Sequence, residues 1–227
     1  MTAIHYTVEA ADLHAHLFKV TLTIAQPQAL QTVSLPVWIP GSYMVREFSG
    51  HLQNLKALQG KRTLAAGQVV QLDKCSWQIR CVPSRPLVLV YEVYANDASV
   101  RTAMLGHERG FFNATSLCLM AQGFEDGPHL LELLPAPARP SWQVATGLPA
   151  QRVDRRGFGV YRAADYDELA DCPVEMGDFW SGEFTACGVV HRFVVAGALP
   201  SFDGERLLRD TQKICEAAIR FWHGAAA

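Results

Sequence analysis

The chain has 227 residues, of which 49% are hydrophobic and 19% charged, so it is long enough to bury the core of one large domain, or of one domain plus the start of another. Its 20 basic and 22 acidic side chains give a net charge of -2, which leaves no basic surplus for phosphate backbones or anionic lipid. We therefore expect neither nucleic acid nor a membrane among its partners.

The N-terminus alternates polar and apolar residues from Met1 to Val20, without the basic segment and apolar core of a signal peptide. No later segment of the sequence is long and apolar enough to span a bilayer. The six cysteines include no Cys-x-x-Cys, which, without an export signal, favours reduced and partly buried thiols. These features predict a cytoplasmic protein.

Polar and apolar residues alternate with a period of two over most of the chain up to residue 198, as they do in strands. Pro, Gly, Asn and Asp interrupt this alternation, as they do between strands. The predicted strands are 5–9, 13–24, 33–39, 50–58, 68–72, 76–81, 87–94, 113–120, 129–134, 143–146, 159–163 and 186–196. Many short strands joined by turns imply antiparallel sheets that pack on one another or curve strongly. The expected fold is mainly β, a twisted antiparallel β-sandwich or saddle-like domain over residues 1–198.

A C-terminal helix is predicted after Pro200, within residues 199–227. Ser201 and Asp203 supply capping oxygens, and Glu205 adds a carboxylate to the first turn. Apolar side chains then recur at helical spacing over about five turns, reckoned at 3.6 residues per turn. They are Leu207, Leu208, Ile214, Ala217, Ala218 and Phe221. This stripe runs almost to the final residue, which predicts a truncated neighbour domain and self-association through the exposed apolar face.

The stretch from residue 38 to residue 48 predicts an ordered corner between strands. Pro40-Gly41 can reverse the chain, because proline fixes φ and glycine admits positive φ. Three aromatic residues are then free to pack on either side of the bend, namely Trp38, Tyr43 and Phe48. Arg46 and Glu47 form either an exposed pair of little energetic value or a buried pair that fixes the corner. Their position favours the structural role.

Three segments carry a resemblance to a known family: VWIPGSY at 37–43 with REF at 46–48, FFNATSL at 111–117, and YDELADCPVEMG at 166–177. In order and spacing they resemble the N-terminal region of the gluzincin-type zinc peptidases with a C-terminal PDZ domain. The best-described members of that family are glycyl aminopeptidases. The resemblance covers nearly the whole chain.

The resemblance implies that this chain is the non-catalytic N-terminal domain of a zinc-dependent aminopeptidase that removes small N-terminal residues such as glycine. The zinc-binding His-Glu-x-x-His motif of such proteins lies further along than residue 227. The chain would then be a fragment, and its helix at 199–227 would open a thermolysin-like catalytic domain. The implied partners are that domain of the same polypeptide and a peptide substrate, and the implied cofactor of the parent protein is zinc.

The chain itself shows no gluzincin zinc motif, which needs two histidines one helical turn apart. His107-Glu108 begins such a motif, but Phe111 occupies the place of the second histidine. His14 and His16 would project from one face of a predicted strand, where a solvated pair is favoured over half of a metal site because no third ligand is apparent. We therefore expect no metal site in this chain.

Residues 111–116 combine two aromatic side chains with three that form hydrogen bonds, as suits the rim of a small pocket. In the broader gluzincin aminopeptidase group, a polar side chain of the N-terminal domain helps to hold the free amine of the substrate. By order along the chain, the resemblance gives that place to Asn113, with Phe112 beside it as a second substrate-binding residue. The alternative is an Asx-turn at a strand entrance with aromatic neighbours in the core.

Residues 165–183 hold seven of the 22 carboxylates, namely Asp165, Asp167, Glu168, Asp171, Glu175, Asp178 and Glu183. Some of them could face the cationic N-terminus of a peptide, or act as acid and base on a glycosidic bond. The alternative is a solvated acidic connector, which composition favours because runs of charge are usually exposed.

Two other functions are compatible with the sequence. The chain could be a stand-alone β-sandwich recognition module that binds glycan or protein through exposed aromatic residues such as Trp142 or Trp180. It could also be a hydrolase that uses the acidic segment without a metal. The favoured interpretation is the peptidase domain, and the isolated chain is then not expected to hydrolyse peptides.

Overall fold

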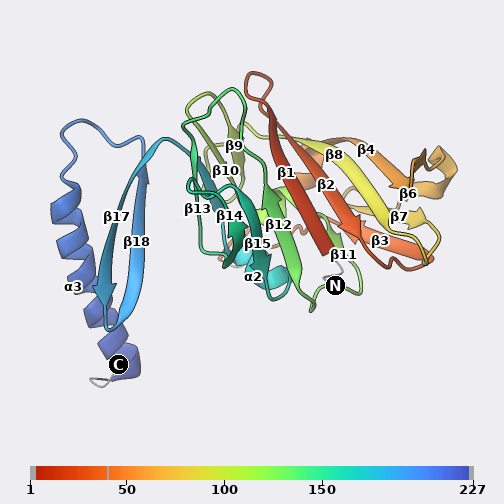
Figure 1. Ribbon diagram of the computed structural model, residues 1–227. Helices are drawn as coiled ribbons and strands as arrows, with labels where there is room; N and C mark the ends of the chain where they lie inside the picture. The colour runs from red at the N-terminus through yellow and green to blue at the C-terminus, as the bar shows by residue number, and fades with distance from the viewer. Residues whose placement is uncertain (1–3, 40, 225–227) are drawn as a thin grey trace. The chain divides into compact units, whose positions relative to one another are not determined.

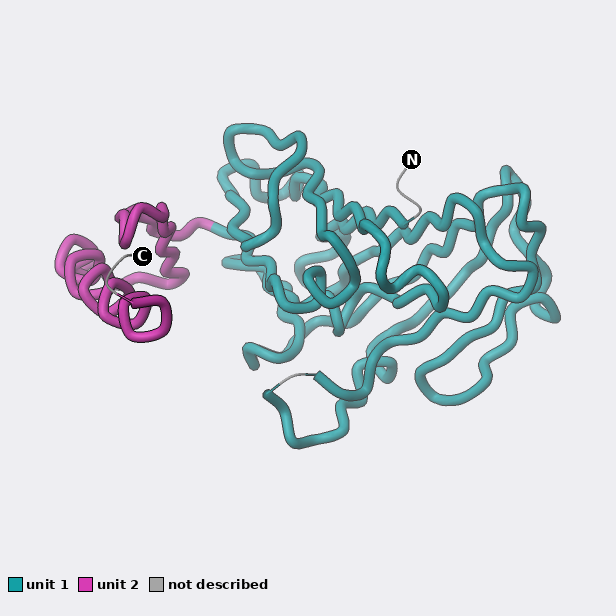
Figure 2. The backbone as a smooth tube through the Cα atoms, turned by 90° about the horizontal axis from the view of Figure 1, so that it is seen from below, with its two compact units in different colours: residues 1–177 teal, residues 178–227 magenta. Residues whose placement is uncertain are grey.

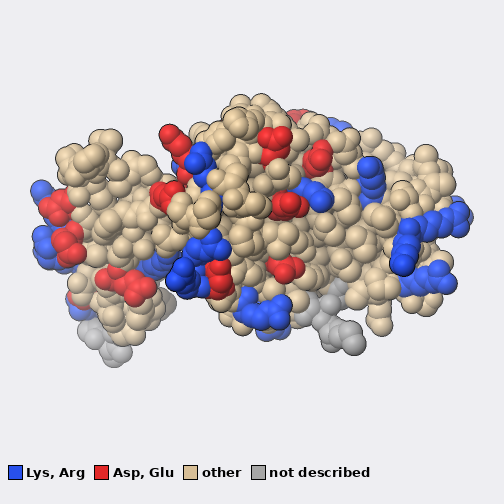
Figure 3. All heavy atoms as spheres, turned by 45° about the horizontal axis from the view of Figure 1, so that its top comes forward, with Lys and Arg blue, Asp and Glu red and all other residues tan. Residues whose placement is uncertain are grey.

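The computed structural model describes residues 4–39 and 41–224. The chain divides into two compact units, Met1–Gly177 and Asp178–Ala227, which Figure 2 distinguishes by colour. Among the described helices, none combines the length and the apolar character that crossing a bilayer requires. Figure 3 shows acidic and basic side chains interspersed on the face that it draws.

The largest sheet of the first unit has eight strands (Figure 1). In spatial order they are β14 (Ala150–Val153), β15 (Gly159–Ala163), β12 (His129–Leu133), β1 (Ile4–Asp12), β2 (Leu17–Ile24), β8 (Leu87–Tyr94), β4 (Leu52–Gln59) and β5 (Arg62–Thr63). Neighbouring strands are antiparallel, except that β1 and β12 run parallel.

Two four-stranded antiparallel sheets complete the strands of this unit. One has the order β13 (Gln143–Thr146), β16 (Val174–Gly177), β10 (Arg109–Phe112) and β9 (Ala103–Leu105). The other has the order β11 (Met120–Ala121), β3 (Leu30–Ser34), β7 (Ser76–Arg80) and β6 (Val69–Gln71). The helical segments are short, namely η1 (Phe48–His51), η2 (Ala66–Gln68), α1 (Ala114–Leu117) and α2 (Tyr166–Asp171).

One continuous apolar cluster joins the three sheets of the first unit. Along β1, Ile4, Tyr6 and Val8 are at most 1% exposed, because successive side chains of a strand point to opposite faces and these three share the inner one. Phe18, Trp142 and other fully buried side chains fill the same cluster. The alternation of polar and apolar residues along β1 therefore corresponds to an outer and an inner face of the strand.

The second unit consists of the antiparallel hairpin of β17 (Phe179–Ala186) and β18 (Val189–Ala196) and the helix α3 (Gly204–His223). The side chain of Asp203 caps α3 by accepting a hydrogen bond from the backbone N–H of Arg206 at 2.9 Å. The helix packs closely on β17, since a Cβ added at Gly204 would lie 2.2 Å from the ring of Trp180. The terminal helix predicted from the sequence is thus confirmed, and the predicted division after residue 198 falls between β18 and α3.

The predicted fold class is confirmed, because the chain is mainly β, with several antiparallel sheets and one long C-terminal helix. Some predicted strands are wrong. Within the strand predicted at 113–120, residues 114–117 form α1 and only Met120 belongs to a strand, the short β11. The strand predicted from Leu13 begins at Leu17, because a turn precedes it. The single strand predicted at 186–196 is the end of β17 and all of β18.

The corner at residues 38–48 is only partly as predicted. Pro40 lies outside the described residues, but Gly41 has a φ of +72°, as a reversal requires. Of the three aromatic residues, only Phe48 is buried, whereas Trp38 and Tyr43 are exposed. Arg46 and Glu47 do not pair with each other. Instead, Arg46 Nε donates to Ser42 Oγ at 3.0 Å, and Glu47 pairs with Lys74 at the surface.

Candidate functional site

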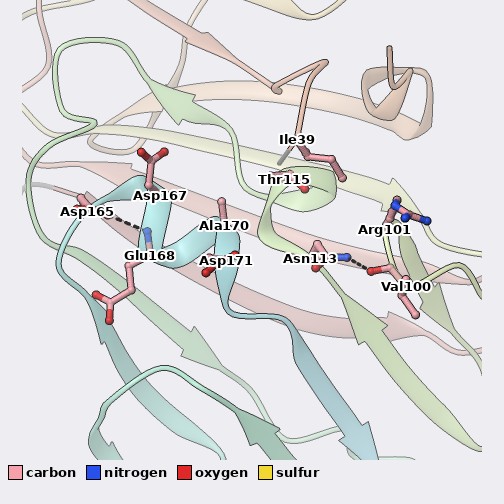
Figure 4. A pocket seen from close by; sticks show the side chains of 10 residues that line it. All are labelled: Ile39, Val100, Arg101, Asn113, Thr115, Asp165, Asp167, Glu168, Ala170 and Asp171. Carbon is pink, nitrogen blue, oxygen red and sulfur yellow. Dashed lines mark hydrogen bonds between the residues drawn. The ribbon is translucent and has the colours of Figure 1, made fainter. Parts of the chain in front are cut away.

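A pocket of about 720 Å³ in the first unit brings together Asn113 and the acidic segment (Figure 4). Its lining consists of Ile39, Val100, Arg101, Asn113, Thr115, Asp165, Asp167, Glu168, Ala170 and Asp171. Two walls face each other in it, one from α1 with the residue before it and one from α2. Two features that were separate in the sequence therefore share one site.

The pairing of β10 with β16 explains why these two walls meet. In this antiparallel pair, Phe112 lies opposite Val174. The chain leaves β10 directly into Asn113 and α1, and it enters β16 directly from α2. Because the end of one strand lies beside the beginning of its antiparallel neighbour, α1 and α2 are placed in contact at the same end of these two inner strands.

Asn113 directly precedes α1, and hydrogen bonding of its side chain fixes its position. It has an extended backbone and precedes the first helical residue, but its side chain does not cap the helix. Instead, its Nδ2 donates to the carbonyl oxygen of Val100 at 2.6 Å. Its Oδ1 receives no hydrogen bond from any described residue. The Asx-turn of the alternative interpretation is therefore absent from the described hydrogen bonds, and the amide oxygen of Asn113 is left as an acceptor in the pocket lining.

Three buried tyrosines fix the segment that follows α1. The hydroxyls of Tyr91, Tyr166 and Tyr6 donate to the carbonyl oxygens of Leu117, Cys118 and Leu119 at 2.7–2.8 Å. Burial raises the pKa of each hydroxyl, so all three remain protonated donors at neutral pH. Since Tyr166 is the first residue of α2, its hydrogen bond also ties the two walls of the pocket together.

The four carboxylates of the α2 wall play two different roles. Asp165 Oδ1 accepts from the backbone N–H of Glu168 at 2.7 Å, and Glu168 Oε2 accepts from the N–H of Ala164 at 2.5 Å. These two side chains therefore stabilise the start of the helix. Asp167 and Asp171 are exposed, lie one turn apart, and form no ion pair or side-chain hydrogen bond with any described residue.

Thr115 contributes a buried hydroxyl to the lining. Its side chain is only 5% exposed, and its Oγ1 has no hydrogen-bond partner among the residues that the structure describes. A buried hydroxyl without a partner is uncommon, because desolvation is then not compensated. Thr115 lies within α1, between the Asn113 side of the pocket and the α2 wall (Figure 4).

Phe112, the second residue predicted to bind substrate, lies in the core and does not line the pocket. It is fully buried, and its ring packs edge-on against that of Phe18 with a centroid distance of 5.5 Å. Its position supports the backbone that carries Asn113. Both assignments as substrate contacts stay predictions.

Glu175 is separated from the other carboxylates of the acidic segment by its own ion pair. It binds Arg109 at 2.5 Å across β10 and β16, and its side chain is mostly buried. Burial raises the pKa of the Glu175 carboxyl, and Arg109 opposes that shift. The interaction links β10 to β16, and the carboxylates left in the pocket lining are those of α2 and of Asp165, which precedes it.

The prediction that His14 and His16 project from one face of a strand is wrong, because both residues lie in the turn before β2. His14 instead contacts His107, with ring centroids 4.1 Å apart, and His107 Nδ1 accepts from Arg139 at 2.8 Å. Desolvation and the nearby His14 and Arg139 lower the pKa of His107. The described residues contain no group of three or more metal-ligating side chains. No sequence pattern indicated this contact, which depends on how distant loops meet.

The two aromatic residues named as examples for a recognition module, Trp142 and Trp180, are not exposed as that alternative requires. Trp142 is fully buried in the core. Trp180 is half-buried and packs edge-on against Phe202 at a centroid distance of 5.1 Å. Both side chains therefore stabilise their own units, and the glycan- or protein-binding alternative loses the two residues that were named for it.

Comparisons with known proteins agree with this architecture. Residues 5–178 match the model of the peptidase M61 N-terminal domain. The chain is 42% identical to an aminopeptidase N family protein from Idiomarina loihiensis, with a TM-score of 0.92 over 98% of this chain and 37% of that one. The chain thus spans well under half the length of that relative.

More distant structures share the fold. An M1 zinc metallopeptidase from Deinococcus radiodurans has a TM-score of 0.51 at 11% identity, over 97% of this chain and 52% of that one. The aminopeptidase A of Legionella pneumophila has a TM-score of 0.52 at 8% identity, over 88% of this chain and 24% of that one. A search of curated proteins found no match. On the match over residues 5–178, this chain belongs to the peptidase M61 N-terminal domain family.

Proposed function

We propose that this chain is the non-catalytic N-terminal domain of a zinc-dependent aminopeptidase that removes small residues such as glycine from the N-terminus of peptides. The family match and the Idiomarina relative support the peptidase context. The single observation that carries a substrate-binding role is the shared pocket, where the amide oxygen of Asn113 lies opposite carboxylates of α2. Acceptor oxygens of this kind suit a protonated amine.

Zinc is not assigned to any residue of this chain. The described residues offer no set of three metal-ligating side chains, so they do not fit a gluzincin centre. In the proposed parent protein, the ion and the water that it activates belong to a catalytic domain, and a PDZ domain lies further along. This chain contributes a wall of the cleft, which limits access to the free amino end of the peptide.

We also propose that α3 opens the neighbouring catalytic domain. The hairpin of β17 and β18 belongs to the same unit as α3, because the helix packs at Gly204 directly against Trp180 of β17. The apolar side chains that α3 exposes, Ile214, Phe221 and Trp222, support a packed neighbour or self-association at that face.

The test uses the product of the same gene that includes the catalytic domain. Asn113→Ala is expected to raise the KM for a glycyl substrate several-fold and to leave the zinc content unchanged, because it removes one contact to the amine. Asn96→Ala is the matched control, since Asn96 Nδ2 contacts Tyr94 Oη outside the pocket. An unchanged KM in Asn113→Ala, or an equal change in Asn96→Ala, would refute the assignment.

A further inference from the structure

We propose that Asp167 and Asp171 form a subsite for the cationic side chain of a lysine or arginine in the bound peptide. The inference rests on the proposed function, because it takes the pocket to be a peptide site. It goes further by naming a second recognition element, on the wall opposite Asn113 (Figure 4). The pocket would then favour peptides that carry a basic residue close to their N-terminus.

The charges of the α2 wall are available to a ligand. Asp165 and Glu168 are occupied by backbone N–H groups, whereas Asp167 and Asp171 have no cationic partner among the described residues. Two like charges one helical turn apart repel each other, and a cation between them relieves that repulsion. Arg101 also lines the pocket, but it forms no ion pair with any described carboxylate.

The second observation is the hydroxyl of Thr115. Thr115 is 5% exposed and lines the same pocket, and its Oγ1 is buried without a hydrogen-bond partner in the described part of the chain. A hydroxyl oxygen accepts hydrogen bonds from ammonium and guanidinium groups. A basic side chain that reaches the α2 carboxylates would therefore also satisfy a buried polar atom, which the protein alone leaves unpaired.

Two further points select an organic cation carried by a peptide. The described residues form no group of three or more metal-ligating side chains, so the carboxylates do not make a cage for a metal ion. The volume of about 720 Å³ lies within the range of about 300–1,000 Å³ that is usual for small-molecule sites. An N-terminal glycine alone would leave most of that volume unfilled.

The test measures peptide binding to the 227-residue chain by calorimetry and by NMR. The probes are Gly-Lys-Ala and Gly-norleucine-Ala, which differ in the charged group, and N-acetyl-Gly-Lys-Ala, which lacks the free amine. Gly-Lys-Ala is expected to bind about tenfold more tightly than the norleucine peptide, because its ammonium group forms charge-assisted hydrogen bonds. Its affinity is expected to fall at high salt, because salt screens the charges. NMR shifts are expected at Thr115 and over α2.

The variants assign the effect to the proposed residues. The double substitution Asp167→Asn with Asp171→Asn is expected to abolish the preference for lysine, and Thr115→Val to reduce it. Asp126→Asn, which changes an exposed carboxylate outside the pocket, is expected to leave it intact. Each variant is expected to fold, because Asp165 and Glu168 keep their helix-capping contacts. Thermal unfolding verifies this for each variant.

The outcomes separate this inference from the proposed function. Equal binding of the lysine and norleucine peptides, no binding of Gly-Lys-Ala, or a lysine preference that survives the double substitution overturns the subsite. Binding of N-acetyl-Gly-Lys-Ala with the same affinity as Gly-Lys-Ala supports the subsite even where the free amine contributes nothing. That last result would count against Asn113 as the amine contact and leave the α2 subsite standing.

Discussion

The two units of this chain bury their apolar residues to very different extents. In the first, strands from three sheets contribute to one cluster, and side chains such as Phe18, Tyr91 and Trp142 are fully buried. In the second, the only buried residues among those described are Ala186 and Gly204. Most apolar side chains of β17, β18 and α3 are half-exposed, and Phe221 and Trp222 are each 77% exposed.

This difference shows that apolar content and burial are separate properties. The first unit has layers enough to enclose a core, whereas one hairpin and one helix cover only one face of each other. The pocket is built on the enclosed unit, where the tyrosine hydroxyls hold its walls. The less buried unit offers surface for contacts with other polypeptide.

The largest expected effect comes from the same substitution made in each unit. Phe112→Ala should lower the free energy of unfolding by about 3–5 kcal/mol, because it leaves a cavity beside Phe18 in the core. Phe221→Ala should change it by less than about 0.5 kcal/mol, because that ring is already in solvent. Urea unfolding followed by circular dichroism measures both. Similar losses in the two variants would contradict the contrast between the units.

A smaller effect is expected at a tightly packed point of the second unit, Gly204. Gly204→Ala should destabilise the packing of α3 on β17 by about 1–3 kcal/mol, since the new Cβ would overlap the ring of Trp180 and force it to move. Hydrogen exchange of the α3 amides measures this loss locally. Gly67→Ala in η2 is the matched control, because a Cβ there meets nothing within 4 Å. Unchanged protection of the α3 amides from exchange would contradict this prediction, because the Trp180 ring would then move without loss of stability.

The sequence predicted the mainly β fold and the terminal helix because both depend on local periodicity. Along β1 and β8, alternate residues are apolar and buried, and α3 has capping residues at its start. It failed at residues 113–120, where an apolar pattern suggested a strand. There, tyrosine hydroxyls bind the carbonyl oxygens of Leu117, Cys118 and Leu119, which in a strand would bind a neighbouring strand. These hydrogen bonds come from distant parts of the chain.

The candidate site was predicted in pieces and not as a whole. Asn113 and the acidic segment were each singled out, but only the opposition of Phe112 and Val174 in β10 and β16 places them at one pocket. Strand pairing between distant segments leaves no local signature. The unpaired hydroxyl of Thr115 was missed for the same reason, since burial without a partner is a property of the packed chain.

The smallest predicted effect concerns pH and again contrasts the units. Burial lowers the pKa of His129 in the first unit, where its Nδ1 contacts the carbonyl oxygen of Gly127 and its Nε2 has no described partner. The folded state therefore binds a proton less readily than the unfolded state. Its contribution to stability is complete above the unfolded pKa of about 6.5 and is lost as the pH falls below that value.

Urea unfolding measured at several pH values between about 8 and 5 tests this dependence, because that interval includes the ordinary pKa of histidine. His129→Phe should flatten the decline in stability on the acidic side, because the group that takes up the proton on unfolding is gone. His191→Phe in the second unit is the control, since His191 is only partly buried on an open hairpin and stacks on Phe184. If the decline is as steep in His129→Phe as in the unmodified chain, the proton responsible binds elsewhere, and the enclosed core of the first unit is not the source of its acid sensitivity.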